Sequence, residues 1–211
     1  MLSADTIVKL HDELTIARHA HPELDTPASS LTSRAADADS SPEFLDRVAQ
    51  QHQANYDLWH IEDEARAPDA TDAELADVKR RIDKTNQVRN DLAEELDRAL
   101  LDWLAPQSLP VPTAPLHSES PGLIIDRLSI LALKIFHTRE QAERDDCSSA
   151  HAERNLARLA ILEEQRTDLA GCLDALWHET LAGTRRFKIY RQLKMYNDPT
   201  LNPAIYRKIA R

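Results

Sequence analysis

The chain has 211 residues, a formal net charge of −10 at pH 7 and only 3 glycines. This length suits one domain with a substantial core and is short for two. Because Ala, Leu, Glu, Asp and Arg dominate and alternating β-branched runs are absent, the sequence predicts an all-α protein. No apolar stretch reaches the roughly 20 residues that a membrane-spanning helix needs, and no secretion signal is recognisable, so we expect a cytoplasmic protein.

Charge and cysteine content narrow the function classes further. Cys147 and Cys172 are too few for a disulfide scaffold and form no Cys-x-x-Cys pair, so we interpret them as reduced thiols. The acidic composition makes nucleic acid an unexpected partner. Residues 184–211, however, carry eight Lys and Arg residues against the single acid Asp198. Such a segment can fold back onto the acidic body, bind an anionic ligand or meet an acidic protein partner.

The first half of the chain predicts three helices. The first runs from Ser3 or Asp5 to about residue 18, and residues 21–42 follow as a mobile loop rich in Pro, Ser, Ala and Asp. The second begins after Ser41, a good N-cap that precedes proline, and extends to about residue 66. The third starts near residue 72 and ends before Pro106.

The second half predicts two further helices and a basic tail. Residues 105–121 form an extended proline-rich connection, and helices follow at about 122–144 and 149–182, with Gly183 as a helix-ending residue. The tail reads as helical to about Tyr196, followed by two short helix starts at Asp198-Pro199 and Asn202-Pro203. We therefore expect one domain over residues 1–211, a bundle of about five main helices with the basic C-terminal segment packed over one end.

Polar residues interrupt the apolar faces of these helices. In the second helix, Asn55, Trp59, Glu62 and Arg66 continue the stripe of Phe44 and Val48, with Asp63 at its edge. Burying these carboxylates is costly unless they are paired or bind something. One interpretation is structural: a buried pair between Glu62 and Arg66, with Asn55 bonded to a neighbouring helix.

Two more helices carry matching interruptions. Asn86 and Arg89 occupy the gap in the apolar stripe of the third helix, and we expect Arg89 to lie against Glu62 or Asp63 in a shared polar layer. In the fourth helix, Asp126 and Lys134 lie with other polar residues on one side, which we expect to face this layer or the basic tail.

A second interpretation is a binding site for an anionic small molecule. Glu62 or Asp63 would then act as general base or magnesium ligand. The other candidate ligand-binding residues supply cations, aromatic rings, amides and two carboxylates. They are Asn55, Trp59, Arg66, Asn86, Arg89, Asp126, Lys134, Arg191, Lys194, Tyr196, Asn197 and Asp198.

A third interpretation is a metalloprotein. His60-x-x-Asp63 and His137-x-x-Glu140 lie on separate predicted helices, which makes His60, Asp63 and His137 candidate metal ligands. Di-iron bundles use the opposite order, Glu-x-x-His, together with two further glutamates. The full ligand set of that class is not evident in this sequence.

Four blocks of residues resemble the bacterial domain-of-unknown-function family 4254. The blocks are Asn55 with Leu58-Trp59-His60, Glu62-Asp63 and Arg66; Asn86-Gln87 with Arg89-Asn90; Asp126 to Ser129 with Lys134 and His137; and Tyr190 to Tyr206. The resemblance covers about residues 44–206, and its motif residues are largely the polar interruptions, which favours a functional site. It also implies a setting of envelope polysaccharide synthesis and glycosyl transfer.

We therefore expect a protein that binds a phosphorylated or otherwise anionic small molecule, such as a sugar nucleotide or sugar phosphate, in a buried polar pocket. Two alternatives stay open: a non-enzymatic partner in a glycan-assembly system, which would bind another protein through its basic tail, and the bundle metalloprotein.

Overall fold

The computed structural model describes residues 2–21, 32, 41–191, 193 and 200–203. Within these residues the protein has five α-helices: α1 (Ala4–Ala20), α3 (Pro42–Glu64), α4 (Asp72–Leu104), α5 (Pro121–Glu143) and α6 (Ser149–Leu181). A short 3-10 helix, η1 (Ala105–Gln107), follows α4. The described residues contain no β-sheet, so the prediction of an all-α bundle is confirmed.

The helix ends lie within two residues of the predicted ones, because local capping chemistry sets them. The Ser41 hydroxyl accepts from the backbone N–H of Phe44 at the start of α3. At the start of α4, Thr71 and Glu74 form a reciprocal capping box. Gly183 follows α6 with φ of 72°, the left-handed conformation that ends many helices.

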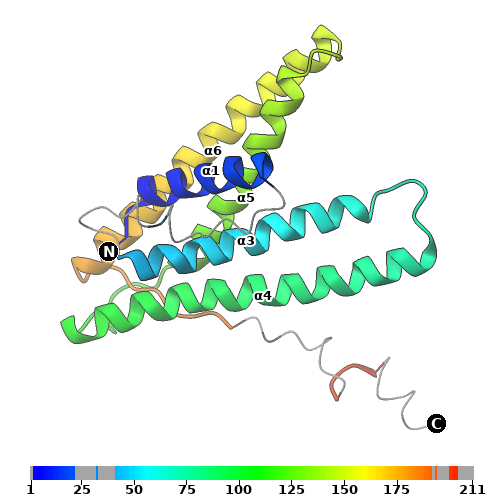
Figure 1. The fold of residues 1–211 in the computed structure, drawn as a ribbon. Coiled ribbons are helices and arrows are strands. Elements are labelled where there is room, and N and C mark those ends of the chain that lie inside the picture. Colours follow the sequence, from blue (N-terminus) through cyan, green and yellow to red (C-terminus); the bar gives the residue numbers. More distant parts are fainter. Residues whose placement is uncertain (1, 22–31, 33–40, 192, 194–199, 204–211) are drawn as a thin grey trace.

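The helices form two antiparallel hairpins, α3 with α4 and α5 with α6, and α5 packs against both helices of the first hairpin. Figure 1 shows α3 beside α4 and α5 beside α6, with α1 lying across the bundle and the far ends of α5 and α6 projecting beyond the other helices. Helix α5 contacts α1, α3, α4 and α6. No helix of the described chain combines the length and apolar character that crossing a membrane requires.

One continuous hydrophobic cluster draws on all five helices. Its fully buried members include Leu10 of α1, Leu45 of α3, Leu100 of α4, Ile125 of α5 and Leu173 of α6. Burying a side chain of this size contributes about 1.5 to 3 kcal/mol. The apolar stripes predicted from the sequence therefore do meet in one core.

The C-terminal segment begins as extended chain, and the predicted helix is wrong over its described part, residues 184–191. The backbone N–H of Arg186 donates to the Pro115 carbonyl at 3.0 Å, and the His117 N–H donates to the Arg186 carbonyl at 2.8 Å. Phe187 is buried in the core. The segment is extended because its backbone groups bond to the proline-rich connection instead of to each other.

Other expectations fall largely outside the described residues. These are the mobile loop at 21–42, the remainder of the basic segment, and the candidate site residues Lys194, Tyr196, Asn197 and Asp198.

The start of α5 is pressed against the backbone of α4. The Gly122 N–H donates to Asp97 Oδ1 at 2.6 Å, and the Ser120 hydroxyl donates to the other oxygen of the same carboxylate. Burial raises the pKa of Asp97 to about 6. A Cβ atom on Gly122 would overlap the carbonyl oxygen of Ala93. This close approach fixes where α5, and every side chain it carries, meets α4.

We predict that Gly122→Ala lowers the free energy of unfolding by about 1 to 3 kcal/mol, because α5 must move away from the α4 backbone. Urea unfolding followed by circular dichroism measures the change. Gly171→Ala is the matched control: it lies within α6 with nothing inside 4 Å of its new Cβ. That variant should gain about 0.5 to 1 kcal/mol from helix propensity. Equal changes in the free energy of unfolding for the two variants would contradict the close contact between Gly122 and the α4 backbone.

Candidate functional site

A buried carboxylate on α5 joins three helices. Asp126 is 7% exposed. Its Oδ1 accepts from Gln51 Nε2 at 2.6 Å, from Asn55 Nδ2 at 3.0 Å and from Arg89 Nε at 2.8 Å. Its Oδ2 accepts from Arg89 Nη2 at 2.6 Å. Asp126 is thus paired bidentately with α4 and hydrogen-bonded twice to α3, which is the condition under which a buried charge is tolerated.

The hydrogen bonds continue from α3 and α5 to α1. Asn55 Nδ2 also donates to Ser129 Oγ at 3.0 Å, and Ser129 Oγ lies 2.8 Å from His52 Nδ1. His52 Nε2 is 3.0 Å from Thr15 Oγ1, whose own proton goes to the His11 carbonyl. His52 therefore carries its proton on Nε2, and the Ser129 hydroxyl donates to Nδ1. We call this chain the polar layer: Thr15, Gln51, His52, Asn55, Arg89, Asp126 and Ser129.

The sequence predicted three members of the polar layer and missed the rest. Asn55 does bond to a neighbouring helix, and Arg89 and Asp126 do lie with it. Gln51 and His52 precede Asn55 by one helical turn, a spacing that the sequence displays. From this spacing, the sequence could have predicted that the polar face of the second helix includes Gln51 and His52.

The predicted partner of Arg89 was wrong, because Asp126 takes that place. Glu62 and Asp63 instead pair with Arg66, at 3.2 and 3.8 Å, near the end of α3. The predicted Glu62–Arg66 pair thus forms at the surface, with the Glu62 side chain 40% exposed and that of Asp63 65% exposed. The last turns of α3 extend past the buried core, so this end of the polar face meets solvent.

A cavity of about 340 Å³ opens between α3, α4 and α5. Its polar lining comes from five predicted site residues, and its apolar lining from two leucines, an isoleucine and the predicted Trp59. The lining residues are Asn55, Leu58, Trp59, Glu62, Asp63, Arg66, Arg89, Ile130 and Leu133. We call this cavity the α3–α5 pocket. Asn86 supports it from outside, because its Oδ1 accepts from Arg89 Nη1 at 3.4 Å.

The other described candidates lie elsewhere. Lys134 is exposed and lines a separate cavity of about 630 Å³ between α5 and α6. Arg191 is exposed in the C-terminal segment. The structure therefore gathers Asn55, Trp59, Glu62, Asp63, Arg66 and Arg89 around one pocket and does not bring Lys134 or Arg191 to it.

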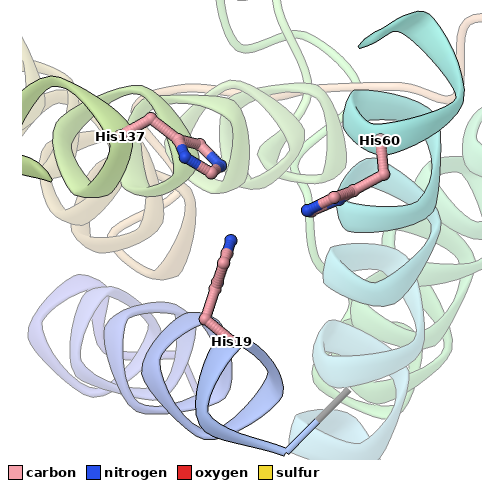
Figure 2. Close-up of side chains that lie close together, drawn as sticks. All are labelled: His19, His60 and His137. Atoms are coloured by element: carbon pink, nitrogen blue, oxygen red, sulfur yellow. The ribbon is translucent and has the colours of Figure 1, made fainter. Parts of the chain in front are cut away.

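Three histidines meet next to Trp59. His19, His60 and His137 come from α1, α3 and α5, and one ring nitrogen of each lies within 4.8 Å of the others (Figure 2). We call them the histidine cluster. Asp63, also predicted as a metal ligand, is not in it. Burial lowers the pKa of His19, which favours the neutral imidazole that binds metals.

Trp59 belongs to one site and contacts the other. Its ring lines the α3–α5 pocket and stacks on His137, with centroids 4.9 Å apart and planes 8° from parallel. The sequence missed His19, because the predicted first helix ends at about residue 18 and nothing in the sequence places its last turn beside the other two histidines.

We predict that Asp126→Asn lowers the free energy of unfolding by about 3 kcal/mol, because it leaves the Arg89 charge unpaired in a largely buried site. The Arg89 side chain is only 23% exposed. Chemical denaturation gives the value. Glu62→Gln is the control and should change stability by less than about 1 kcal/mol, since it breaks a surface pair. A loss at Asp126 no larger than the control's would argue against the buried pair.

Acid should destabilise the protein through two buried histidines. Burial lowers the pKa of His52 to about 3 and lowers that of His11, stacked on it at 4.8 Å, well below its usual value. The native rings stay neutral while the unfolded chain binds protons below about pH 6.5. Each histidine therefore lowers the free energy of unfolding by up to about 1.4 kcal/mol for every pH unit below 6.5.

His11→Leu provides the test, because both ring nitrogens of His11 lack a hydrogen-bond partner within the described chain. We expect the variant to be more stable at pH 7 and to lose less stability per pH unit between pH 6.5 and 5, measured by urea unfolding at each pH. Comparing variant and parent cancels the opposite contribution of Asp97. Unchanged slopes would show that His11 titrates normally.

Comparison with known proteins gives one match. A family model described as a protein of unknown function (DUF4254) matches residues 45–189. The matched region contains the whole α3–α5 pocket, together with His60 and His137, and begins after His19. No curated protein and no solved structure matches the chain. Because the matched residues make up well over half of the sequence, the chain belongs to the DUF4254 family.

Proposed function

We propose that the protein binds a small anionic molecule, such as a sugar nucleotide or sugar phosphate, in the α3–α5 pocket. The observation that carries this proposal is the position of Arg89. Arg89 lines the pocket, and two of its guanidinium nitrogens are held by Asp126. The third nitrogen, Nη1, carries two N–H groups, and its contact to Asn86 uses one of them.

A guanidinium held in this way suits anion recognition. Because Asp126 and Asn86 already fix the side chain, binding a ligand costs little additional rotamer entropy. The remaining N–H group can then donate to a phosphate or carboxylate oxygen. Asp126 acts here as a positioning residue, since it sets the place and direction of the donor.

The rest of the lining matches a molecule with both a charged and an apolar part. Arg66 lies at the exposed end of the pocket, where its pairs with Glu62 and Asp63 are surface pairs that contribute about 0 to 1 kcal/mol. An anion can exchange with these carboxylates at little cost. Leu58, Trp59 and Leu133 offer apolar surface for a ring.

The acids give the proposal an enzymatic version. Glu62 and Asp63 line the same pocket as the two arginines, so either carboxylate can act as general base or magnesium ligand beside a bound anion. The proposal keeps the glycan-synthesis setting as an expectation from the sequence resemblance.

The alternative of a protein partner for the basic tail has less support. Arg185 pairs with Glu179 at 2.9 Å, and Arg186 Nε donates to the Ala114 carbonyl at 2.8 Å. The first cations of the tail are thus used within the chain itself.

We predict that a sugar nucleotide or sugar phosphate raises the melting temperature in a thermal-shift screen run with and without Mg²⁺. A ligand at 100 times its dissociation constant adds about 2.7 kcal/mol, which corresponds to roughly 5 to 10 °C for a domain of this size. Arg66→Gln should abolish the rise without altering the ligand-free melting temperature.

Arg139→Gln is the control, because it breaks an equivalent surface pair, with Glu163, between α5 and α6. It should leave the ligand shift intact. A shift that survives Arg66→Gln would place the ligand elsewhere, and no shift with any member of the panel would contradict the proposal.

A further inference from the structure

We propose that the histidine cluster, His19, His60 and His137, binds a divalent transition metal ion, with Zn²⁺ as the best match. Figure 2 shows the three rings converging from α1, α3 and α5 on a common point. This site lies beyond the proposed function, because none of the three histidines lines the α3–α5 pocket.

Hydrogen bonds assign the proton of each ring. His19 Nδ1 lies 2.8 Å from the Thr15 carbonyl oxygen, and His60 Nδ1 lies 2.8 Å from the Tyr56 carbonyl oxygen. His137 Nδ1 lies 2.9 Å from Glu140 Oε2. Carbonyl and carboxylate oxygens are hydrogen-bond acceptors, so Nδ1 of each ring carries a proton. When a ring is neutral, its Nε2 keeps a lone pair, the form in which histidine ligates metals.

Two of these nitrogens have no hydrogen-bond partner in the described chain. They are Nε2 of His19 and Nε2 of His137, and both are buried. Buried polar atoms are rarely left unpaired, because losing their hydration costs about 1 to 3 kcal/mol each. A cation at the point where the rings converge would satisfy both atoms at once.

The spacing of the rings fits a metal after small adjustments. Zn²⁺ binds histidine nitrogens at about 2.0 to 2.1 Å, which places two ligands of a tetrahedral ion about 3.3 Å apart. The ligand nitrogens of the cluster lie within 4.8 Å of one another. A move of each nitrogen toward their common centre by about 1 Å would bring them into this geometry.

The surroundings resemble those of known metal sites. Metal-binding histidines usually donate their second N–H to a carbonyl or carboxylate, which orients the ring and strengthens the ligand. All three rings here do so, and Glu140 supplies the carboxylate. Aromatic rings restrict two of them further, since Phe136 stacks on His19 at 4.2 Å and Trp59 stacks on His137.

The donor set indicates the class of ion. Three neutral nitrogens without a thiolate suit Zn²⁺, Co²⁺, Ni²⁺ or Cu²⁺ better than the oxygen-seeking Mg²⁺ or Ca²⁺. Three protein ligands also leave the fourth tetrahedral position open for water or another small ligand, as catalytic zinc sites do.

Titration with Co²⁺ tests the site in the full chain, prepared without a histidine tag and stripped with a chelator. We expect one Co²⁺ per chain, with the visible absorption of a four- or five-coordinate ion, and displacement by one equivalent of Zn²⁺. His19→Ala and His60→Ala should each remove this absorption. His178→Ala, which removes an exposed histidine at the end of α6, should leave it unchanged.

Two further measurements separate binding from folding. Glu140→Gln changes a half-exposed side chain that holds His137, and should weaken Zn²⁺ binding about 10- to 100-fold while the fold is kept. Zn²⁺ should also raise the melting temperature of the parent chain and not that of His19→Ala. Parent protein that binds no stoichiometric Co²⁺, or variants at His19 and His60 that bind it unchanged, would overturn the proposal.

Discussion

The carboxylate of Asp126 is the constraint on which the arrangement of the helices depends. It is a buried charge on the one helix that contacts all the other described α-helices, and its partners come from α3 and α4. Apolar contacts are nearly indifferent to direction, so a leucine stripe alone permits helices to slide and rotate. Four hydrogen bonds to one carboxylate group do not permit this. The apolar core holds the helices together, and the polar layer determines their register.

This register places candidate functional residues on two sides of α3. On the side toward α4, the pair between Arg89 and Asp126 brings a fixed guanidinium to the α3–α5 pocket. On the side toward α1, the same alignment of α3 and α5 brings His60 beside His137 and presents both to His19. Trp59 is a shared wall, since it lines one site and stacks against the other. The two proposed sites therefore depend on one set of interhelical bonds.

The sequence predicted the helices and much of the pocket, but not the pairing of its charges. Periodicity shows which side of a helix is apolar, and caps such as Ser41 show where it starts. Neither shows which helix becomes the neighbour, or how far the core extends along it. Arg89 was therefore assigned to an acid of α3 when its partner is on α5, and Glu62 was expected to be buried although α3 extends past the core.

The remaining differences have the same origin. His19 joins His60 and His137 only through packing between helices, which spacing within one helix cannot reveal. Residues 184–191 include several that tolerate a helix, yet Phe187 and the carbonyls of the proline-rich connection hold this stretch extended. Tertiary contacts outweigh local preference there, as they commonly do in short segments without a strong periodic pattern.

The connectivity also has a consequence for the order in which the molecule assembles. Each hairpin, α3 with α4 and α5 with α6, closes over a short turn and costs little loop entropy. The bonds of Asp126, by contrast, join residues 37 to 75 positions apart, and the bond from the Ala4 N–H to Asp174 spans 170 positions. Contacts of such separation slow folding. The hairpins can therefore form from local contacts, whereas the polar layer requires that they dock with each other and with α1, which supplies Thr15.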